Sequence, residues 1–161
     1  MAAAVGRSVR QSNVLRGKAW AVLFEAVDPT GANDHFFHMK PTGDAVEITK
    51  IELYRTVAGF VEVHRATGTS STPTALIPKN LGQSQASPAG VFESGVDLVM
   101  TAGEKVARHY LAADTPRIIE LEEGLVVPKN GGIVFNWVPA TGILSGTVTF
   151  HGLPAEDNPS L

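Results

Sequence analysis

Two histidines and two aspartates lie close together near the start of the chain, in a combination that could bind a metal ion. His35 and His38 are three residues apart, and Asp28 and Asp34 precede them. In a β-strand, side chains at i and i+3 point to opposite faces, so the two imidazoles do not converge. The aspartates also lack the alternating oxygen ligands and the distal glutamate of a calcium loop. The sequence therefore predicts no metal site.

Serine and histidine residues offer a second possible chemistry, nucleophilic hydrolysis. Ser94 and Ser145 are the candidate nucleophiles, and the candidate bases are His64, His109 and His151. Neither serine lies in a G-x-S-x-G sequence, the sharp turn that exposes a nucleophile in many hydrolases. Almost any chain of this size contains a serine, a histidine and an aspartate, so their presence does not indicate a catalytic triad.

Two other enzyme classes can be considered from local patterns. Glu120 and Glu122 share a strand face, as the two carboxylates of a glycosidase would, but no aromatic platform for a sugar surrounds them. The segment "GTSSTPTA" (68–75) lacks the residue order of a phosphate-binding loop. We predict that the protein is not an enzyme and binds no cofactor.

The composition indicates one globular domain. The 161 residues are 43% hydrophobic and 18% charged, which is enough apolar sequence to form a core. No apolar run reaches the roughly 18–20 residues of a membrane span, and the first ten residues lack the apolar centre of a secretory signal. The absence of cysteine fits assembly in a reducing cytoplasm.

Charge is distributed unevenly along the chain. The first 18 residues carry four bases and no acid, whereas the remainder carries nine bases and sixteen acids; the four bases are Arg7, Arg10, Arg16 and Lys18. A basic arm (1–17) on an acidic body favours docking onto an acidic surface, although a loose, solvated chain end is the alternative. The acidic body lacks the basic and aromatic residues of a specific nucleic-acid-binding face.

The first half of the chain predicts four β-strands. In the segment 18–27 both alternating sets of side chains are apolar, which predicts a strand buried on two faces. An aromatic strand is expected at 35–39. Along 45–55 the apolar phase slips at Thr49–Lys50, which predicts a β-bulge or a change of buried face. The strand at 60–67 is expected to form a hairpin with 45–55.

The second half continues the pattern. Residues 68–90 predict a long loop rich in Ser, Thr, Pro and Gly, and 103–114 is compatible with either a helix or a strand. Further strands follow, and "PKNGG" (128–132) predicts a hairpin turn in which Asn and Gly take left-handed conformations. Near the end, Val148 and Phe150 are expected to face the core and His151 to face solvent.

Nine or ten short strands separated by Gly and Pro predict an all-β fold, an antiparallel β-sandwich or jelly roll. We expect a single domain at 18–153, an extended arm at 1–17 and a flexible tail at 154–161. The residues expected to pack the core or an oligomer contact are Trp20, Phe24, Ile51, Leu53, Phe135, Trp137 and Phe150.

The chain resembles a family of small β proteins encoded among the virion genes of tailed bacteriophages. The similarity covers roughly residues 18–153, and the segments that carry it are 28–31, 57–60, 113–115, 128–132 and 137–142. These segments are turn and core signatures, so they are more specific for fold than for role.

The resemblance implies a jelly-roll cement or decoration protein, which binds the outside of the virion head and stabilises contacts between major capsid protein subunits. It implies a homodimer or homotrimer, made in the host cytoplasm, with no membrane partner and no catalytic residues. The arm lies outside the resemblance, and its docking on the capsid is inferred from its charge. A receptor- or glycan-binding module of a tail fibre or head spike is the alternative, with the 68–90 loop as its binding element.

Overall fold

The structure is a computed structural model that describes residues 18–29, 35–71, 73–82, 86–96, 98, 100–138 and 141–153. These residues form strands and connecting turns, with no helix among them and hence none that could span a membrane. The strands are β1 (Ala19–Val27), β2 (His35–Pro41), β3 (Val46–Arg55), β4 (Gly59–Thr67), β5 (Thr74–Ala75), β6 (Lys79–Asn80), β7 (Gly90–Ser94), β8 (Thr101–Leu111), β9 (Arg117–Val127), β10 (Gly132–Val138) and β11 (Leu144–Gly152).

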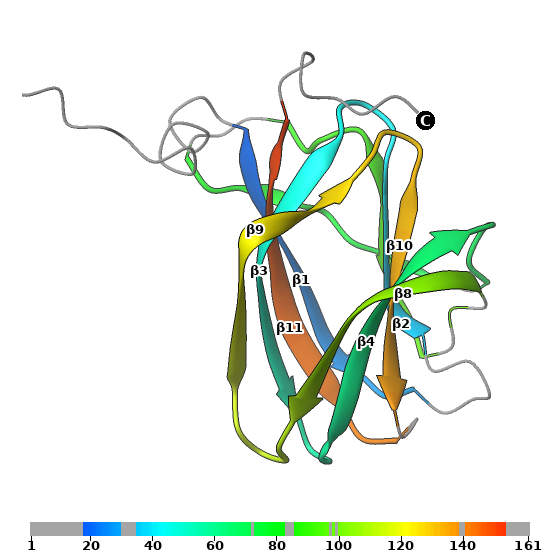
Figure 1. The fold of residues 1–161 in the computed structure, drawn as a ribbon, viewed down its shortest axis with the longest axis vertical. Helices are drawn as coiled ribbons and strands as arrows, with labels where there is room; N and C mark the ends of the chain where they lie inside the picture. The colour runs from blue at the N-terminus through cyan, green and yellow to red at the C-terminus, as the bar shows by residue number, and fades with distance from the viewer. Residues whose placement is uncertain are drawn as a thin grey trace, which may run out of the picture.

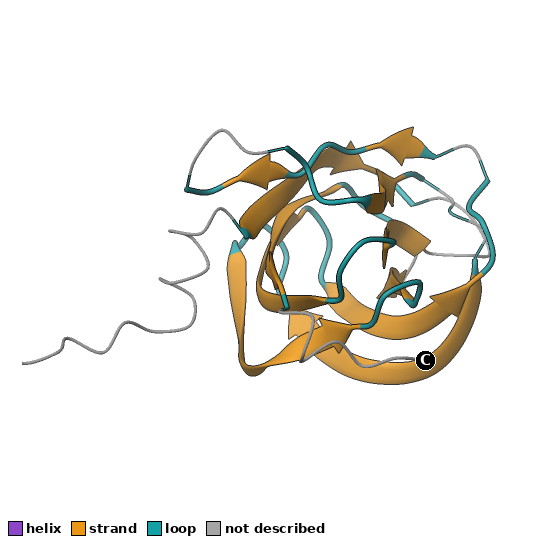
Figure 2. Cartoon of the chain, turned by 90° about the horizontal axis from the view of Figure 1, so that it is seen from above, coloured by secondary structure: helices purple, strands orange, loops and turns teal. Residues whose placement is uncertain are grey.

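Two antiparallel sheets pack against each other, so the predicted β-sandwich is confirmed (Figure 1). One sheet has the order β6-β1-β11-β3-β9, and the other has the order β5-β7-β2-β10-β4-β8. Seen from above, both sheets curve around a common interior (Figure 2). Each sheet therefore buries one face in the same core, as the alternation of apolar residues requires.

The long strands pair in a regular way. β1 pairs with β11, β2 with β10, β3 with β9 and β4 with β8, all antiparallel. The first four strands therefore run against the last four as one long ribbon, which folds across the core so that successive strands alternate between the two sheets. Most strand pairs join residues far apart in sequence, so short turns alone cannot set the register.

Two predicted hairpins are wrong for this reason. β3 and β4 are consecutive but belong to different sheets, and so do β9 and β10. The connections at 56–58 and 128–131 therefore cross from one sheet to the other. Asn130 does take the left-handed conformation, with φ of 63°, and the Gly131 N–H donates to the Pro128 carbonyl at 2.9 Å. The left-handed conformation is therefore confirmed for Asn130, whereas neither Gly131 nor Gly132 has a positive φ. A correctly predicted turn residue does not indicate which strands the turn joins.

The phase slip at Thr49–Lys50 corresponds to a β-bulge. β3 is continuous from Val46 to Arg55, and its register shifts against β9 between Ile48 and Lys50 and against β11 between Thr149 and Phe150. The bulge lets Val46, Ile48, Ile51 and Leu53 all reach the core although they differ in parity. The bulge interpretation of the pattern is confirmed.

The prediction that the segment 18–27 is buried on both faces is wrong. Trp20, Val22 and Phe24 are buried, but Leu23 on the other face is 53% exposed. Among the described residues no second layer covers this face of β1, so Leu23 is left exposed. A further correction concerns His151, which is buried instead of solvent-facing; its Nε2 lies 2.8 Å from Glu47 Oε2.

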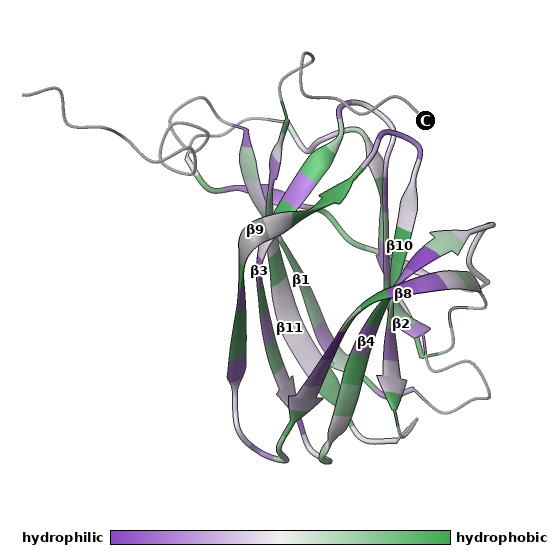
Figure 3. Cartoon of the chain, viewed as in Figure 1, coloured by the Kyte–Doolittle hydropathy of each residue, from purple (hydrophilic) through white to green (hydrophobic). Residues whose placement is uncertain are grey.

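The segments 103–114 and 68–90 both contain β-strands. Residues 101–111 form strand β8, so the strand interpretation of 103–114 is confirmed over the helix. The 68–90 segment contains the two short strands β5 and β6, which pair with β7 and β1 respectively. It therefore spans the two sheets along one side of the sandwich. Figure 3 shows apolar and polar residues alternating along the long strands.

Candidate docking surfaces

The predicted arm lies almost entirely outside the described residues. Arg7, Arg10 and Arg16 belong to this part of the chain, whereas Lys18 is described. Its Nζ is 3.9 Å from Asp44 Oδ2, and both side chains are about half exposed. Such a surface ion pair contributes little to stability. Lys18 also continues the β1 ladder, because its carbonyl accepts a hydrogen bond from the Gly152 N–H at 2.9 Å.

The seven residues expected in the core or an oligomer contact all lie in one hydrophobic cluster between the sheets. They are Trp20, Phe24, Ile51, Leu53, Phe135, Trp137 and Phe150, and all are buried. The indole N–H of Trp137 donates to the Thr141 carbonyl at 2.8 Å, which satisfies the one polar atom of that ring. These residues hold one subunit together.

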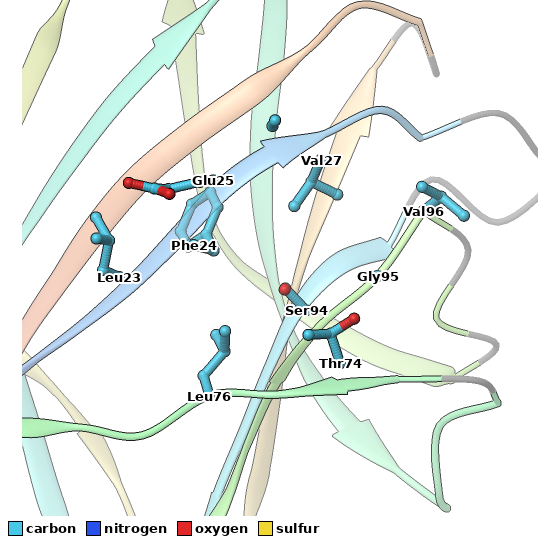
Figure 4. A pocket seen from close by; sticks show the side chains of 10 residues that line it. Leu23, Phe24, Glu25, Val27, Thr74, Leu76, Ser94, Gly95 and Val96 are labelled. Carbon is cyan, nitrogen blue, oxygen red and sulfur yellow. The ribbon is translucent and has the colours of Figure 1, made fainter.

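A groove of about 390 Å³ opens at the side of the sandwich where β1 faces β5 and β7 (Figure 4). Leu23, Phe24, Glu25, Ala26 and Val27 form one wall. Thr74, Leu76, Ser94, Gly95 and Val96 form the other. The volume lies within the range of roughly 300–1,000 Å³ that ligand sites occupy, and most of the lining is apolar. We call this feature the β1 groove.

The β1 strand has an unpaired edge inside this groove. β6 pairs only with Trp20 and Ala21, and no other described strand joins β1 on that side. The Leu81 N–H donates to the Ala19 carbonyl at 2.9 Å, which shows that odd-numbered residues of β1 direct their backbone groups toward the β6 side. Because the direction alternates along a strand, Leu23 presents its N–H and C=O groups to the groove. Between Phe24 and Val27 a β-bulge, in which Ala26 has φ of 50°, interrupts this alternation.

Exposed apolar side chains gather on the same side of the sandwich. Besides Leu23, Val96 on the other wall of the groove is 50% exposed. Ile77 and Leu81, which flank β6, are also exposed. Sequence reasoning missed this surface because it expected Leu23 to be buried and treated 68–90 as a loop. The available signal was the uninterrupted apolar pattern of 19–24, which a strand with one buried face does not need.

The opposite side of the sandwich, where β8 is the edge strand, has a different character. Glu62 of β4 is buried beneath β8, and its Oε1 accepts from Lys105 Nζ at 2.6 Å and Arg108 Nε at 3.0 Å. His64 Nε2 lies 3.3 Å from Glu62 Oε2. The Arg108 guanidinium stacks 3.9 Å above the Phe60 ring. We call these side chains the Glu62 cluster.

The pKa of Glu62 reflects these contacts. Burial alone would favour the neutral carboxylic acid, but hydrogen bonds from Lys105 and His64 and the positive charges of Lys105 and Arg108 outweigh burial and lower its pKa. The carboxylate therefore stays ionised and joins β4 to the edge strand. β8 is also bulged against β4 at two points, between Val63 and His64 and between His64 and Ala66.

A buried arginine, Arg55, lies beside the turn that joins β8 to β9. Arg55 is 1% exposed, and its guanidinium donates to the Thr115 carbonyl; the Asp114 N–H donates back to the Arg55 carbonyl at 2.9 Å. Burial lowers the pKa of this guanidinium. These bonds fix the 112–116 turn that joins β8 to β9, in which Asp114 is left-handed with φ of 50°. Arg55 therefore has a structural role.

The described histidine candidates are not grouped with other metal-binding side chains, and Asp34 lies outside the described residues. His38 Nδ1 lies 2.6 Å from Glu93 Oε1, which also accepts from Ser70 Oγ, and both members of the His38–Glu93 pair are buried. His35 Nδ1 is 3.0 Å from the Leu98 carbonyl instead. Within the described part of the chain, no three His, Asp or Glu side chains are grouped to hold a metal.

The two candidate nucleophiles lie in different sheets. Ser94 is in β7, whereas Ser145 is in β11 and its Oγ accepts from the Ala26 N–H at 3.0 Å.

No protein-family model, curated protein or solved structure matches this chain.

Proposed function

We propose that this protein is a capsid cement or decoration protein of a tailed bacteriophage, which binds the outer surface of the head and stabilises contacts between major capsid protein subunits. The observation that carries the proposal is the β1 groove, an apolar groove with an unpaired strand edge on one side of the β-sandwich. An open apolar edge suits adhesion to another protein. The resemblance of residues 18–153 to virion proteins supports the phage head as the partner surface.

The jelly-roll form of the sandwich is part of this proposal. The long strands follow the orders β1-β11-β3-β9 and β2-β10-β4-β8, with successive strands alternating between sheets. A long antiparallel ribbon wrapped across a core in this way is what two interlocked Greek keys produce, and jelly rolls recur in viral capsid domains. The strand order supports the jelly roll over a sandwich with hairpin connections.

In the proposed arrangement the body forms a homodimer or homotrimer on the head, and the basic residues of the arm contact an acidic surface of the major capsid protein. Lys18, where the described chain begins, is exposed at the start of β1. Several such arms on one oligomer would bind the lattice together, so that modest contacts give near-permanent attachment. The protein is made in the host cytoplasm and resides on the outside of the virion.

One observation favours the second candidate, a receptor- or glycan-binding module. Sugar-binding sites use exposed aromatic rings. The 68–90 loop contains no aromatic residue, but Tyr110 on β8 is 56% exposed and packs edge-on against Phe60, with ring centroids 5.4 Å apart. In this alternative the binding surface is the outer face of β4 and β8.

Co-sedimentation with heads that lack the protein tests the proposal. Purified full-length chain is titrated against such heads, beside a chain that starts at Lys18. Saturable, stoichiometric pelleting supports the cement function, and a loss of affinity without residues 1–17 shows that attachment needs the arm. Pelleting that ignores the deletion moves the contact onto the β body. If nothing pellets, the cement function is wrong, and glycan-array binding of the Tyr110 surface becomes the next test.

A further inference from the structure

We propose that the β1 groove binds a β-strand supplied by the arm, residues 1–17, of a second copy of this chain. The inference rests on the homo-oligomer of the proposed function and names the contact that would hold it together. The arm would then have two roles. One set of its side chains would enter the groove of the second copy, and the other set would stay outside and remain available for the capsid.

The unpaired edge of β1 supplies the backbone part of the site. Leu23 directs its N–H and C=O groups into the groove, past the point where β6 ends, and the bulged residues up to Val27 continue the same wall. An added strand would pair at Leu23 and extend the sheet β6-β1-β11-β3-β9 alongside β1. From Leu23 to Val27 this wall is five residues long, at most roughly 16 Å at about 3.3 Å per residue, so a short strand is sufficient.

The groove also selects the kind of side chain. Phe24, Val27 and Leu76 give it apolar walls, and Leu23 and Val96 add exposed apolar surface at its rim. Glu25 is the one charged residue that lines it, and it lies on the solvent side of β1. A strand that fits would therefore place small apolar side chains toward Phe24 and a cation beside Glu25.

The arm has this composition. It contains Val5, Val9, Val14 and Leu15, no proline that would interrupt pairing, and no acid. Its arginines alternate closely with these residues: Val9 directed into the groove places Arg10 on the outer face, on the same side as Glu25. The remaining arginines stay available for an acidic capsid surface.

The position of the arm favours a neighbouring copy over the same chain. The arm joins β1 at Lys18, one residue before the strand begins, and β6 occupies the edge of β1 at Trp20 and Ala21. To reach its own groove the arm would have to reverse direction and pass over β6. Seventeen extended residues reach up to about 56–60 Å, which is enough to cross to a second subunit.

Disulfide mapping tests the inference directly, since the chain has no cysteine of its own. Full-length chains carrying Val5→Cys, Val9→Cys or Val14→Cys are each mixed with a full-length chain carrying Val96→Cys in the groove, then oxidised mildly. Ile118→Cys, on the far edge strand β9 and similarly exposed at 58%, is the matched control. We expect a mixed disulfide with Val96→Cys for at least one arm position, at least tenfold more abundant than with Ile118→Cys.

Two outcomes overturn the inference. Equal cross-linking to the groove and to the control position, or none to either, shows that the arm does not occupy the groove. A chain carrying both an arm cysteine and Val96→Cys that closes within a monomer at high dilution shows that the groove holds its own arm. Head binding is measured separately, so cross-linking without pelleting rejects the cement function alone, and pelleting without cross-linking rejects this inference alone.

Sedimentation equilibrium provides a second, independent readout on the full-length chain. Leu23→Glu places a charge at the groove without altering the core and should weaken self-association at least tenfold, whereas Ile118→Glu should leave it unchanged within twofold. Removal of residues 1–17 should convert the oligomer to monomer. A full-length chain that is monomeric at all concentrations, or an oligomer that is indifferent to both Leu23→Glu and the deletion, contradicts the proposal.

Discussion

The two sides on which the sandwich opens are built differently. On the β1 side the edge strand is unpaired beyond Ala21, its neighbours are apolar, and a groove separates the sheets. On the β8 side the edge strand carries charges, is bulged at two points and is held down by Glu62. Figure 3 shows polar stretches along β8. Both are edges of the same sandwich, but the β8 edge is the more strongly protected.

This difference indicates where the molecule can accept a partner. Charged side chains and bulges on an edge strand are the usual means by which β proteins avoid pairing with other chains. β8 uses both, with several charges and two bulges, whereas β1 has one charged residue, Glu25, and one bulge between Phe24 and Val27, and neither between Ala21 and Phe24. The β1 edge is therefore the less protected of the two. The open β1 edge is therefore best explained as a binding surface.

The largest expected effect concerns the core that both edges share. Trp137 is completely buried and its indole N–H is satisfied. Replacing it by Ala should lower the free energy of unfolding by about 3–5 kcal/mol, through lost burial and the cavity left behind. Urea denaturation followed by circular dichroism measures this change. A fully stable variant would contradict the placement of β10 in the sandwich.

A smaller effect is expected on the protected side. Glu62→Gln should lower the free energy of unfolding by about 1–2 kcal/mol, because Lys105 and Arg108 would lose their shared carboxylate, although both cations are partly exposed and screened. The matched change on the open side, Leu23→Gln, should cost less than about 0.5 kcal/mol. Equal costs at the two sites, measured by the same denaturation, would remove the contrast between the edges.

Acid should weaken the protected side first. The lowered pKa of Glu62 means that its stabilising contribution is complete above the unfolded value of about 4.3 and is lost as the pH falls through the folded pKa. Burial, and next the charge of Arg117, lower the pKa of His109, so the unfolded state takes up that proton first and stability falls as the pH drops below about 6.5.

Denaturation at a series of pH values checks both signs. His109→Gln should flatten the stability curve just below pH 6.5, and Glu62→Gln should flatten it below about pH 4.3. An unchanged slope in either variant would show that the corresponding group does not couple folding to protonation.

Patterns that depend on one strand were predictable from the sequence. The bulge at Thr49–Lys50 left a visible change of parity, and Ile133, Phe135 and Trp137 of β10 share one parity and one core face, although Val134 on the other face is buried as well. Patterns that depend on which strands pair were not. "PKNGG" looks the same whether it joins neighbours in one sheet or crosses between two, because the turn bonds are local and the pairing of β9 with β3 is not.

The candidate docking surface was the least predictable feature. It arises because β5, β6 and β7 stop short of covering β1, which depends on where the 74–96 segment lies and not on any local motif. The Glu62 cluster likewise brings together side chains about 45 residues apart in the sequence. Alternation of β8 could suggest a strand, but could not identify its acidic partner.

Head binding by matched variants of the two edges tests the central claim most directly. Leu23→Glu and Tyr110→Glu each replace a half-exposed apolar side chain, one at the β1 groove and one on β8. Both full-length variants are titrated against heads that lack the protein, beside the unaltered chain. The account predicts at least tenfold weaker pelleting for Leu23→Glu, since losing the oligomer removes multivalent attachment, and no more than a twofold change for Tyr110→Glu. Equal loss in both variants, or loss only in Tyr110→Glu, would contradict it.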